Sequence, residues 1–393
     1  MRILSMTAQK PDSTGSGVYL TELVKCWAAM GHRQAVVAGV YREDRVSLPE
    51  GVDFYPVTYG SERLPYPILG MSDTMPYEST RYRDLTEEQA DQFERAFHEA
   101  AVRAVEELKP DRIICHHLYY LTALVRKWFP DIPVFGVCHG TDLRQLSQIP
   151  FKGSFIRESI RGLNGIMALH EAQKQEIQRI FSCPAEQIRV VGAGYNDLIF
   201  NSEGKTAHPG KQIAFAGKVC EKKGIFSLIG ALDRLSYPKD SLTVKIAGGY
   251  KEKEEYEKIR RAAEKCQVPI AFLGAVPQAR LADLFRESDL FVLPSFFEGL
   301  PLVTLEAMAC GCRVVCSDIP GMAAWFAENV PGHQTEFVPL PTIRNVDEPV
   351  QEELPAFEER LAAAMDRQLA KPAGAPVDLR NATWDGISRK ILG

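Results

Sequence analysis

The chain of 393 residues is too long for one ordinary hydrophobic core and is expected to form two domains. Hydrophobic residues make up 45% of it and charged residues 25%, a balance that excludes a disordered or fibrous protein. The formal net charge of −5 gives no broad cationic field, so a nucleic acid is not expected as a partner.

The first half alternates short apolar runs with amphipathic stretches, which is typical of a parallel sheet covered by helices on both faces. The predicted series opens with a strand at Arg2–Met6, a loop containing Thr14-Gly15-Ser16-Gly17, a helix at Val18–Met30 that ends before Gly31, and a strand at Gln34–Ala38. The segment Val57–Asp84 shows neither a helical nor a strand period.

A long helix is predicted next. Thr86 with Gln89 forms a capping-box pattern, and apolar residues then recur on one helical face, at Phe93, Phe97, Ala100, Ala104 and Leu108. Further strands are predicted at Arg112–Cys115, Val134–Cys138, Gly165–Leu169 and Ile188–Val191, with helices near Leu121–Phe129 and Glu171–Phe181. This order predicts a doubly wound α/β domain.

A polar stretch, Asn201–Lys211, separates this series from a second one that begins with Ile213-Ala214-Phe215-Ala216. Strands are predicted near Thr243–Ala247, Ile270–Leu273, Leu290–Leu293 and Arg313–Cys316, and helices near Ile225–Leu235, Glu252–Cys266, Gln278–Glu287 and Leu302–Ala309. The chain continues with a helix from Glu352 to Leu369, a Pro-rich break at Lys371–Pro376 and a last helical segment, Thr383–Leu392. We therefore expect doubly wound domains at residues 1–203 and 204–375, followed by a terminal helix within residues 376–393.

Nine cysteines are scattered singly apart from Cys310 and Cys312, which favours reduced thiols over a disulfide framework. The N-terminus turns polar after Met6, before an apolar run reaches the length of a signal peptide or membrane span. A cytoplasmic protein is expected, and peripheral contact with the inner face of a membrane stays open.

Gly15, Ser16 and Gly17 lie between a predicted strand and a predicted helix, where free amides and the positive helix end favour a phosphate. The loop lacks the third glycine of a dinucleotide fingerprint, and strand two ends in Ala38-Gly39 rather than in an acidic residue. A nicotinamide cofactor is therefore disfavoured. A tight turn needed only for packing is the alternative.

Two lysines in a second glycine-containing loop provide the next signal. The loop runs Gly217-Lys218-Val219-Cys220-Glu221-Lys222-Lys223-Gly224 between a strand and a helix. A departing diphosphate gains negative charge in the transition state, so the ammonium groups of Lys218 and Lys223, placed beforehand with helix-end amides, lower the barrier. Gly217 is expected to contact the same group. A solvated charge cluster is the alternative.

The most specific stretch runs from Pro294 to Gly311 and contains Glu298 and Glu306. Glu298 is expected in a loop after a strand, where ligands of open α/β sheets bind. Glu306 falls about two helical turns later within an apolar helix, so it needs hydrogen-bond donors, and a ribose diol offers two. We expect Glu306 to anchor the nucleoside and Glu298 to accept from sugar hydroxyls, with the donor also contacting Gly299, Leu300, Pro301 and Leu302.

His139 and Asp142 follow directly after the predicted strand Val134–Cys138. His139 is expected to contact the donor sugar or the charge that develops beside the reacting carbon. Asp142 is a candidate for an acceptor contact, for orienting a side chain or for capping the next helix. A metal at Cys115-His116-His117 is disfavoured because adjacent strand residues point to opposite faces. No Asp-x-Asp triplet occurs, so the lysines would replace a metal at the diphosphate.

With these motifs, the chain resembles the retaining GT-B glycosyltransferases of glycosyltransferase family 4 over nearly its whole length. Glu298 to Glu306 looks like the family's E-x7-E signature, and Lys218 and Lys223 occupy the positions of its basic pair, which is commonly arginine then lysine. Asn196, in Val191-Gly192-Ala193-Gly194-Tyr195-Asn196, stands where an aspartate is frequent and is a candidate for an acceptor contact or an orienting role.

The resemblance implies two Rossmann-like domains facing a central cleft, a final helix that crosses back to the first domain, retention of anomeric configuration, and no metal or other cofactor. Retention would follow from a front-face displacement in which the leaving diphosphate takes the acceptor's proton. A narrower similarity, in Gly15-Ser16-Gly17-Val18 with Thr21-Glu22-Leu23 and in His139-Gly140-Thr141-Asp142, concerns the branch containing the N-acetylglucosaminyl malate synthases, which use UDP-N-acetylglucosamine.

The sequence thus predicts transfer of a sugar from a UDP-sugar, such as UDP-N-acetylglucosamine or UDP-glucose, to a hydroxyl of a small molecule, lipid or glycan. The nucleotide sugar is a substrate and not a cofactor. Two alternatives stay open: a GT-B sugar-nucleotide epimerase or phosphorylase, and a sugar-nucleotide-binding protein without catalysis. The acceptor, the donor sugar and the oligomeric state are not predicted.

Overall fold

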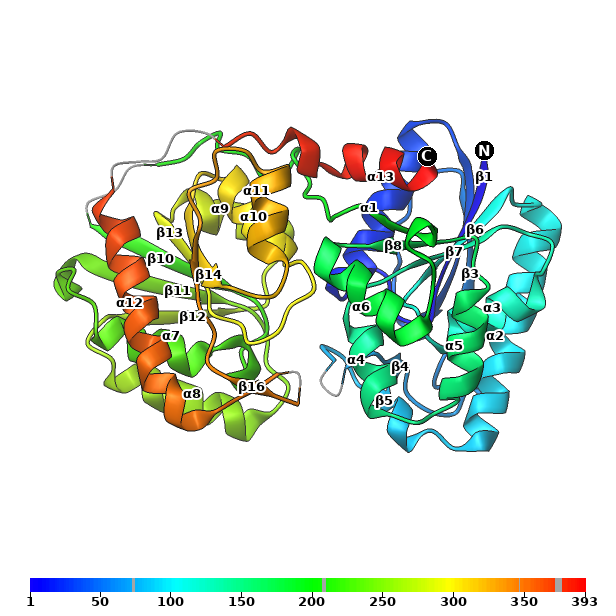
Figure 1. The fold of residues 1–393 in the computed structure, drawn as a ribbon, viewed down its shortest axis with the longest axis horizontal. Coiled ribbons are helices and arrows are strands. Elements are labelled where there is room, and N and C mark those ends of the chain that lie inside the picture. The colour runs from blue at the N-terminus through cyan, green and yellow to red at the C-terminus, as the bar shows by residue number, and fades with distance from the viewer. Residues whose placement is uncertain (73–74, 207–209, 346, 372–376) are drawn as a thin grey trace. The chain divides into compact units, whose positions relative to one another are not determined.

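The computed structural model describes residues 1–72, 75–206, 210–345, 347–371 and 377–393. The chain forms two compact units, one made of Met1–Ala193 with Trp384–Gly393 and the other of Gly194–Thr383 (Figure 1). Each unit contains a parallel sheet with helices, which confirms the predicted α/β class.

The first unit is built on a seven-stranded sheet in the order β3-β2-β1-β6-β7-β8-β9, in which all neighbours are parallel. Its strands are β1 (Arg2–Thr7), β2 (Arg33–Val40), β3 (Val52–Thr58), β6 (Arg112–His116), β7 (Val134–Val137), β8 (Gly165–Ala168) and β9 (Ile188–Val190). Strand order reverses beside β1, so the carboxyl ends of the strands there form the place where ligands of such sheets bind. The edge strand β3 was not predicted, since Pro56 interrupts its pattern.

Both faces of this sheet are covered. Ala35 and Val37 of β2 pack in the core that contains Phe93, which comes from α2 (Glu87–Leu108). Val36 and Ala38 pack instead against Leu20 and Val24 of α1 (Gly15–Ala29). Alternate residues of one strand thus face opposite helix layers, as in a doubly wound domain. The capping box at Thr86 and Gln89 is confirmed.

The aperiodic segment 57–84 contributes to the core of the first unit. Within it, β4 (Leu69–Gly70) pairs with β5 (Thr80–Arg81), and a short 3-10 turn spans Tyr82–Asp84. Its side chains in this core are Val57, Tyr59, Leu64, Tyr66, Ile68, Leu69, Met71 and Tyr82, and Met75 is buried as well. Because these residues are buried from irregular backbone, neither sequence period reveals them. Residues 73–74 lie outside the described part.

Helices α3 (Tyr120–Trp128) and α6 (Glu171–Phe181) match the predicted ones. Two further helices, α4 (Thr141–Gln148) and α5 (Gly153–Arg161), were not predicted. Each spans about two turns and buries few side chains, so its periodic signal is short.

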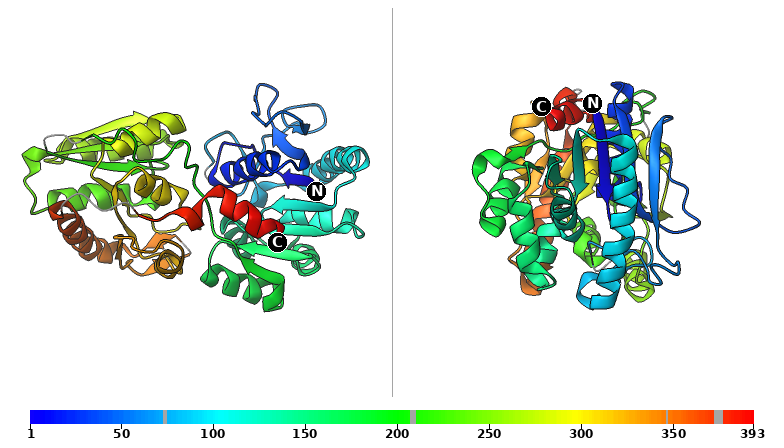
Figure 2. Two further views of the ribbon diagram at one scale, coloured as in Figure 1. Left: turned by 90° about the horizontal axis from the view of Figure 1, so that it is seen from above. Right: turned by 90° about the vertical axis from the view of Figure 1, so that its right-hand side faces the viewer.

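The last helix, α13 (Trp384–Leu392), packs against α1 in the first unit, and the two lie side by side in Figure 2. The Trp27 indole nitrogen donates to the Ser388 carbonyl at 3.2 Å. The ring of Trp384 meets that of Tyr19 edge-on, with 4.9 Å between centroids. The final helix therefore belongs to the first unit, as the family resemblance implied.

The units divide at 193/194 and 383/384, whereas the sequence placed the divisions at 203/204 and 375/376. Hydrogen bonds within the second unit explain the difference. The Tyr195 amide donates to the Ala382 carbonyl at 3.0 Å, and the Arg286 guanidinium donates to the carbonyls of Ile199 and Asn201. These bonds hold both connecting segments in the second unit. Residues 207–209 of the predicted linker and 372–376 of the Pro-rich break lie outside the described residues.

The second unit has a six-stranded parallel sheet in the order β12-β11-β10-β13-β14-β15. Its strands are β10 (Lys211–Ala216), β11 (Leu242–Ala247), β12 (Ile270–Gly274), β13 (Leu290–Leu293), β14 (Arg313–Ser317) and β15 (Glu336–Val338). The predicted helices are present as α7 (Ile225–Asp233), α8 (Lys253–Lys265), α9 (Gln278–Arg286), α10 (Leu302–Ala309) and α12 (Leu354–Ala370). Strand order reverses here between β10 and β13.

The second unit also contains elements that the sequence did not reveal: α11 (Met322–Asn329), β15, and a hairpin of β16 (Ile343–Arg344) and β17 (Glu348–Pro349). Among the described residues of both units, no helix combines the length and apolar character needed to cross a membrane.

Candidate functional site

The lysine loop of the second unit lies at the carboxyl end of β10 and leads into α7. After Gly217 the chain forms a 3-10 turn at Glu221–Lys223 and enters α7 through Gly224, whose φ is +70°. A Cβ atom on Gly224 would lie 2.0 Å from the Pro294 carbonyl oxygen. Only glycine allows this close approach, which brings the lysine loop into contact with Pro294, directly after β13.

Lys223 and Glu298 form an ion pair. The pair joins the lysine loop to the loop between β13 and α10, and the Phe296 amide adds a hydrogen bond to the Lys222 carbonyl at 3.1 Å. The Lys223 side chain is 23% exposed and that of Glu298 16% exposed. Two residues predicted from separate motifs are thus in direct contact at the β10–β13 reversal.

Lys218 lies in the same electrostatic field. Burial lowers the pKa of Lys218 to about 8, and the positive charges of Lys223 and Lys251 act in the same direction, while Glu298 and Cys220 oppose them. Because these cations repel one another in a partly buried place, an anion bound there would be stabilised. This is the electrostatic requirement of a diphosphate site.

Glu306 lies on α10 and is 8% exposed. The helix begins after Pro301, whose carbonyl accepts a hydrogen bond from the Thr304 hydroxyl at 2.7 Å. Its neighbours Leu305, Ala307 and Met308 are buried, so Glu306 is a carboxylate within an apolar helix. Leu300 and Pro301, two residues of the segment predicted to contact the donor, are also buried.

The lysine loop also makes a contact that could not be predicted from the sequence. The Lys222 ammonium donates to both carboxylate oxygens of Asp347, at 3.0 and 2.9 Å, and Asp347 is 3% exposed. Asp347 lies between β16 and β17, far along the chain from Lys222. No spacing in the sequence links the two residues, since only the fold brings them together.

In the first unit, His139 follows β7 and is half-buried. Asp142 is fully buried and accepts from the backbone amides of Leu118, His139 and Leu143, at 2.8, 3.2 and 3.1 Å. Asp142 therefore ties the β7–α4 loop to the end of β6. Its oxygens thus accept from backbone amides of the chain itself, and its role at the site stays a prediction.

Two more histidines surround His139. His116, at the end of β6, shares a hydrogen bond with it, 3.1 Å between His116 Nδ1 and His139 Nε2, and the two rings stack 5.3 Å apart. The His117 ring lies 4.8 Å from that of His139, and Tyr19 meets His139 edge-on at 5.3 Å. Burial lowers the pKa of His116 to about 3 and lowers those of His117 and His139. All three rings are therefore neutral near pH 7.

The residues Gly15 to Gly17 form the first turn of α1 rather than a loop before it, which corrects the predicted start at Val18. The Thr14 hydroxyl caps the helix by accepting from the Gly17 amide at 3.2 Å. A Cβ atom on Gly17 would lie 2.7 Å from the Lys10 carbonyl oxygen, so this glycine serves the close approach of the β1–α1 loop. Gly15 has open space around its Cβ position, so the helix end there is sterically accessible.

Asn196 lies in the second unit, after the division between the units. Its side-chain oxygen accepts from the Leu198 amide at 3.1 Å, and its carbonyl accepts from the amides of Ile199 and Phe200. Asn196 therefore shapes the turn that enters the second unit.

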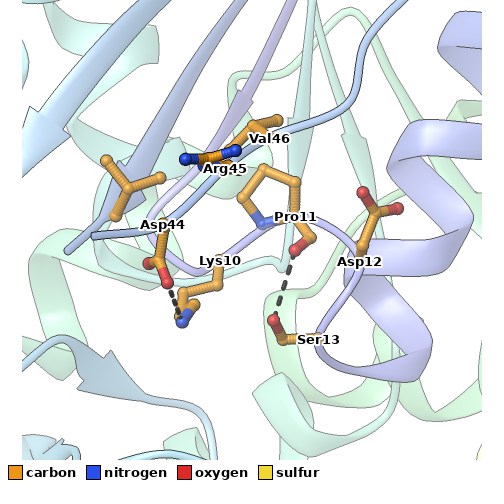
Figure 3. Close-up of a pocket in the computed structure, with 8 residues that line it drawn as sticks. Lys10, Pro11, Asp12, Ser13, Asp44, Arg45 and Val46 are labelled. Atoms are coloured by element: carbon orange, nitrogen blue, oxygen red, sulfur yellow. Dashed lines mark hydrogen bonds and ion pairs between the residues drawn. The ribbon is translucent and has the colours of Figure 1, made fainter. Parts of the chain in front are cut away.

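A small pocket of about 130 Å³ lies beside the β1–α1 loop. Figure 3 shows Lys10 paired with Asp44 there and Ser13 donating to the Pro11 carbonyl. The Lys10 ammonium also lies 5.4 and 5.3 Å from the ring centroids of Tyr41 and Tyr77. Its charge is thus already matched, and none of the predicted site residues lines this pocket.

Within the described residues, no three His, Cys, Asp or Glu side chains are grouped to hold a metal ion.

His116 is the site neighbour that the sequence could have revealed. It ends β6, and β6 pairs with β7 in parallel with His116 opposite Val137. Because the carboxyl ends of neighbouring parallel strands meet at one sheet edge, His116 and His139 had to lie close together. Tyr19 carried no such signal, since its position on α1 reads only as an apolar helix face.

Two family models match the chain. Residues 14–194 match the Glycosyl transferase 4-like domain, and residues 199–338 match Glycosyl transferases group 1. The first match covers most of the first unit, and the second covers Lys218, Lys223, Glu298 and Glu306.

The chain is also similar to curated glycosyltransferases, at low sequence identity and over part of each chain. The chain is 28% identical over 179 residues to an uncharacterized glycosyltransferase of Methanocaldococcus jannaschii, and the match spans 42% of this chain and 45% of that one. It is 27% identical over 293 residues to a glycogen synthase of Mycobacterium tuberculosis, which covers 69% of each chain.

Solved structures agree in fold. A sucrose-phosphate synthase from Thermosynechococcus elongatus superposes with a TM-score of 0.70 at 16% identity, covering 100% of this chain and 97% of the other. HepE from Anabaena, solved in complex with UDP and glucose, gives a TM-score of 0.61 at 14% identity, covering 100% and 98%.

Proposed function

Because the chain belongs to the GT-B glycosyltransferases of family 4, we propose that it is a retaining, metal-independent transferase that moves a sugar from a UDP-sugar to an acceptor hydroxyl. The observation that carries this proposal is the grouping of Lys218, Lys223 and Glu298 where the strand order of the second sheet reverses. Glu306 lies on the helix that follows the same loop.

Lys218 and Lys223 hold the donor diphosphate in this proposal. Lys223 leaves Glu298 for a phosphate oxygen, and the anion raises the pKa of Lys218 so that both ammonium groups stay charged. As the bond to the sugar breaks, negative charge grows on the departing diphosphate, and the two preplaced cations stabilise it. This is the reason to expect turnover without a metal ion.

Glu298, released from Lys223, accepts hydrogen bonds from hydroxyl groups of the donor sugar, and Glu306 accepts from the ribose diol. The apolar surroundings of Glu306 strengthen such bonds, since water competes poorly for the carboxylate there. A UDP donor is supported by HepE, which has the same fold and was solved with UDP and glucose. The amide end of α1, with Gly15 and Ser16, is a second place for a phosphate.

Retention requires that the acceptor oxygen form its bond on the face from which the diphosphate leaves. In this mechanism the leaving diphosphate oxygen takes the acceptor's proton, the bond from the anomeric carbon to that oxygen breaks, and the bond to the acceptor oxygen forms. No side chain then has to act as general base. In this proposal the protein acts in the cytoplasm, and the acceptor is a small molecule, a lipid or a glycan.

The test is acceptor-dependent release of UDP from a panel of UDP-sugars, measured with and without EDTA. Turnover that survives EDTA and gives a product with the donor's anomeric configuration by NMR is expected. A product of inverted configuration, or full loss of activity with EDTA that added metal restores, would overturn the mechanism. A change of the UDP-sugar without acceptor would indicate an epimerase instead.

Two variants connect the activity to the site. Lys218→Ala should lose most UDP binding, because one of two diphosphate cations is removed. Lys253→Ala, a change at the exposed first residue of α8, is the matched control and should bind UDP normally. Equal UDP affinity in both variants would remove Lys218 from the donor site.

A further inference from the structure

His139 is held by one side-chain hydrogen bond, and the partner is His116. The distance between His116 Nδ1 and His139 Nε2 is 3.1 Å, and the ring planes are inclined by only 13°. The Tyr19 hydroxyl is bonded elsewhere, to the Gly192 carbonyl at 3.0 Å, and Asp142 meets His139 only through the backbone amide. His139 Nδ1 has no hydrogen-bond partner among the described residues.

Both rings are neutral, since burial lowers the pKa of each. A neutral imidazole carries one N–H and one bare nitrogen, so one ring donates in the shared bond and the other accepts. Which ring donates follows from the surroundings and not from the distance.

His116 Nε2 decides the direction. This nitrogen is buried, and within the described part of the chain it has no hydrogen-bond partner. If His116 accepted at Nδ1, its proton would sit on Nε2 as a buried donor without an acceptor. If His116 donates at Nδ1, Nε2 carries only a lone pair. Buried unpaired N–H groups are rarer in proteins than unpaired acceptors, so the second arrangement is favoured.

We propose that His116 is a positioning residue: its Nδ1–H donates to His139 Nε2 and thereby holds His139 as the tautomer whose free nitrogen, Nδ1, carries the proton. His139 then presents a hydrogen-bond donor, and its ligand is an oxygen atom of the donor sugar. This inference rests on the proposed glycosyltransferase function for the identity of that ligand. The tautomer itself does not depend on it.

A consequence is that His139 does not act as a general base. Its lone pair is already used by His116, and the nitrogen left for a substrate is protonated. Besides His116, the titratable side chains that contact the ring among the described residues are His117, whose Nδ1 lies 4.0 Å from an Asp142 oxygen, and Tyr19. Neither shares a hydrogen bond with the His139 ring in the described structure.

The first test needs no substrate. Long-range ¹H–¹⁵N spectra of protein labelled with ¹⁵N-histidine distinguish the two neutral tautomers, and the signals of His116 and His139 are assigned by their loss in His116→Asn and His139→Gln. Both rings are expected to be protonated at Nδ1. An Nε2-protonated His139 would overturn the proposal, whatever reaction the protein catalyses.

The second test compares two variants at one position. His116→Asn keeps an N–H donor near His139, and His116→Leu removes it. The leucine variant should lose on the order of tenfold in kcat/KM for the UDP-sugar and show His139 as a mixture of tautomers, while the asparagine variant retains most activity. Unchanged UDP affinity and thermal unfolding in both variants verify that the fold is intact.

Equal losses in both folded variants, or no loss in His116→Leu, would contradict the positioning role. If the leucine variant does not fold, the wild-type spectrum still decides the tautomer. Failure of the proposed function would look different: the spectrum would show Nδ1-protonated His139, but no UDP-sugar would be turned over by the wild type.

Discussion

The ammonium group of Lys223 is paired with the carboxylate of Glu298, and this ion pair joins the loop after β10 to the loop before α10. Both side chains are mostly buried, so each is the chief compensation for the other's charge. In the proposed mechanism, a donor that binds through its diphosphate to Lys223 exchanges this contact for a new one and so releases Glu298 toward the sugar.

Glu298→Gln should separate binding from transfer. Because Lys223 no longer has to leave a carboxylate, the affinity for UDP should lie between that of the wild type and a value about tenfold higher. The rate of sugar transfer should fall by about 100-fold or more, since the sugar hydroxyls lose a charged hydrogen-bond acceptor. Calorimetry with UDP and the rate of UDP release measure the two effects. Glu254→Gln, at an exposed position of α8, is the control. Weaker UDP binding in Glu298→Gln would contradict the exchange.

UDP affinity should fall as the pH rises from about 7 to about 9, because the pKa of Lys218 is lowered to about 8. Below that value Lys218 is charged and attracts the diphosphate, and above it the free protein must first take up a proton. Over this range the Kd for UDP is expected to rise about tenfold. Lys218→Arg should flatten the profile, since a guanidinium stays charged. An equally steep profile in that variant would assign the pH dependence to another group.

Glu306→Gln should weaken UDP but not inorganic pyrophosphate. A carboxylate that accepts from a ribose diol contributes about 1.5 to 3 kcal/mol, which corresponds to a loss of roughly 10- to 100-fold in UDP affinity. Pyrophosphate has no ribose and should bind both proteins equally. Competition calorimetry with the two ligands gives both numbers. Parallel losses for both ligands would place Glu306 at the diphosphate instead.

Gly224→Ala should destabilise the second unit by more than about 3 kcal/mol. The alanine would need a φ of +70° and would place Cβ 2.0 Å from the Pro294 carbonyl oxygen. Gly332→Ala is the matched control, with a φ of +77° and no atom within 4 Å of the Cβ position. The control should show only the conformational cost of about 1 to 2 kcal/mol. Urea unfolding of both variants measures the difference, and similar values would show that the loop moves aside.

Trp384→Ala should destabilise the first unit by about 3 to 5 kcal/mol, although Trp384 lies near the end of the chain. Its side chain is 4% exposed and packs on Tyr19. Asp385→Ala, at the next residue, removes only an exposed ion pair with Arg389 and should change stability by less than about 1 kcal/mol. Unfolding followed by tryptophan fluorescence measures the change in Asp385→Ala, and circular dichroism compares both variants. Equal stabilities would mean that α13 contributes little to the first unit.

Local patterns predicted the regular elements well. The alternation of apolar runs and amphipathic stretches predicted the two parallel sheets, and the helices from Glu171 to Phe181 and from Leu302 to Ala309 have the predicted bounds. The sequence missed the strands β3 and β15, the two-residue strands β4, β5, β16 and β17, the helices α4, α5 and α11, and the buried packing of segment 57–84. Segment 57–84 lacks a period because long-range packing, not local repetition, holds it in place, and the missed helices are too short for a clear periodic signal.

By itself, the sequence determined which residue types are available at the ends of β7, β10 and β13, because strand ends and glycine turns are encoded locally. Only the tertiary structure decided how they meet. It paired Lys223 with Glu298, placed Asp347 against Lys222, and formed the hydrogen bond between His116 and His139. These contacts join residues from different loops, and their geometry depends on strand order and loop packing, which no spacing along the chain records.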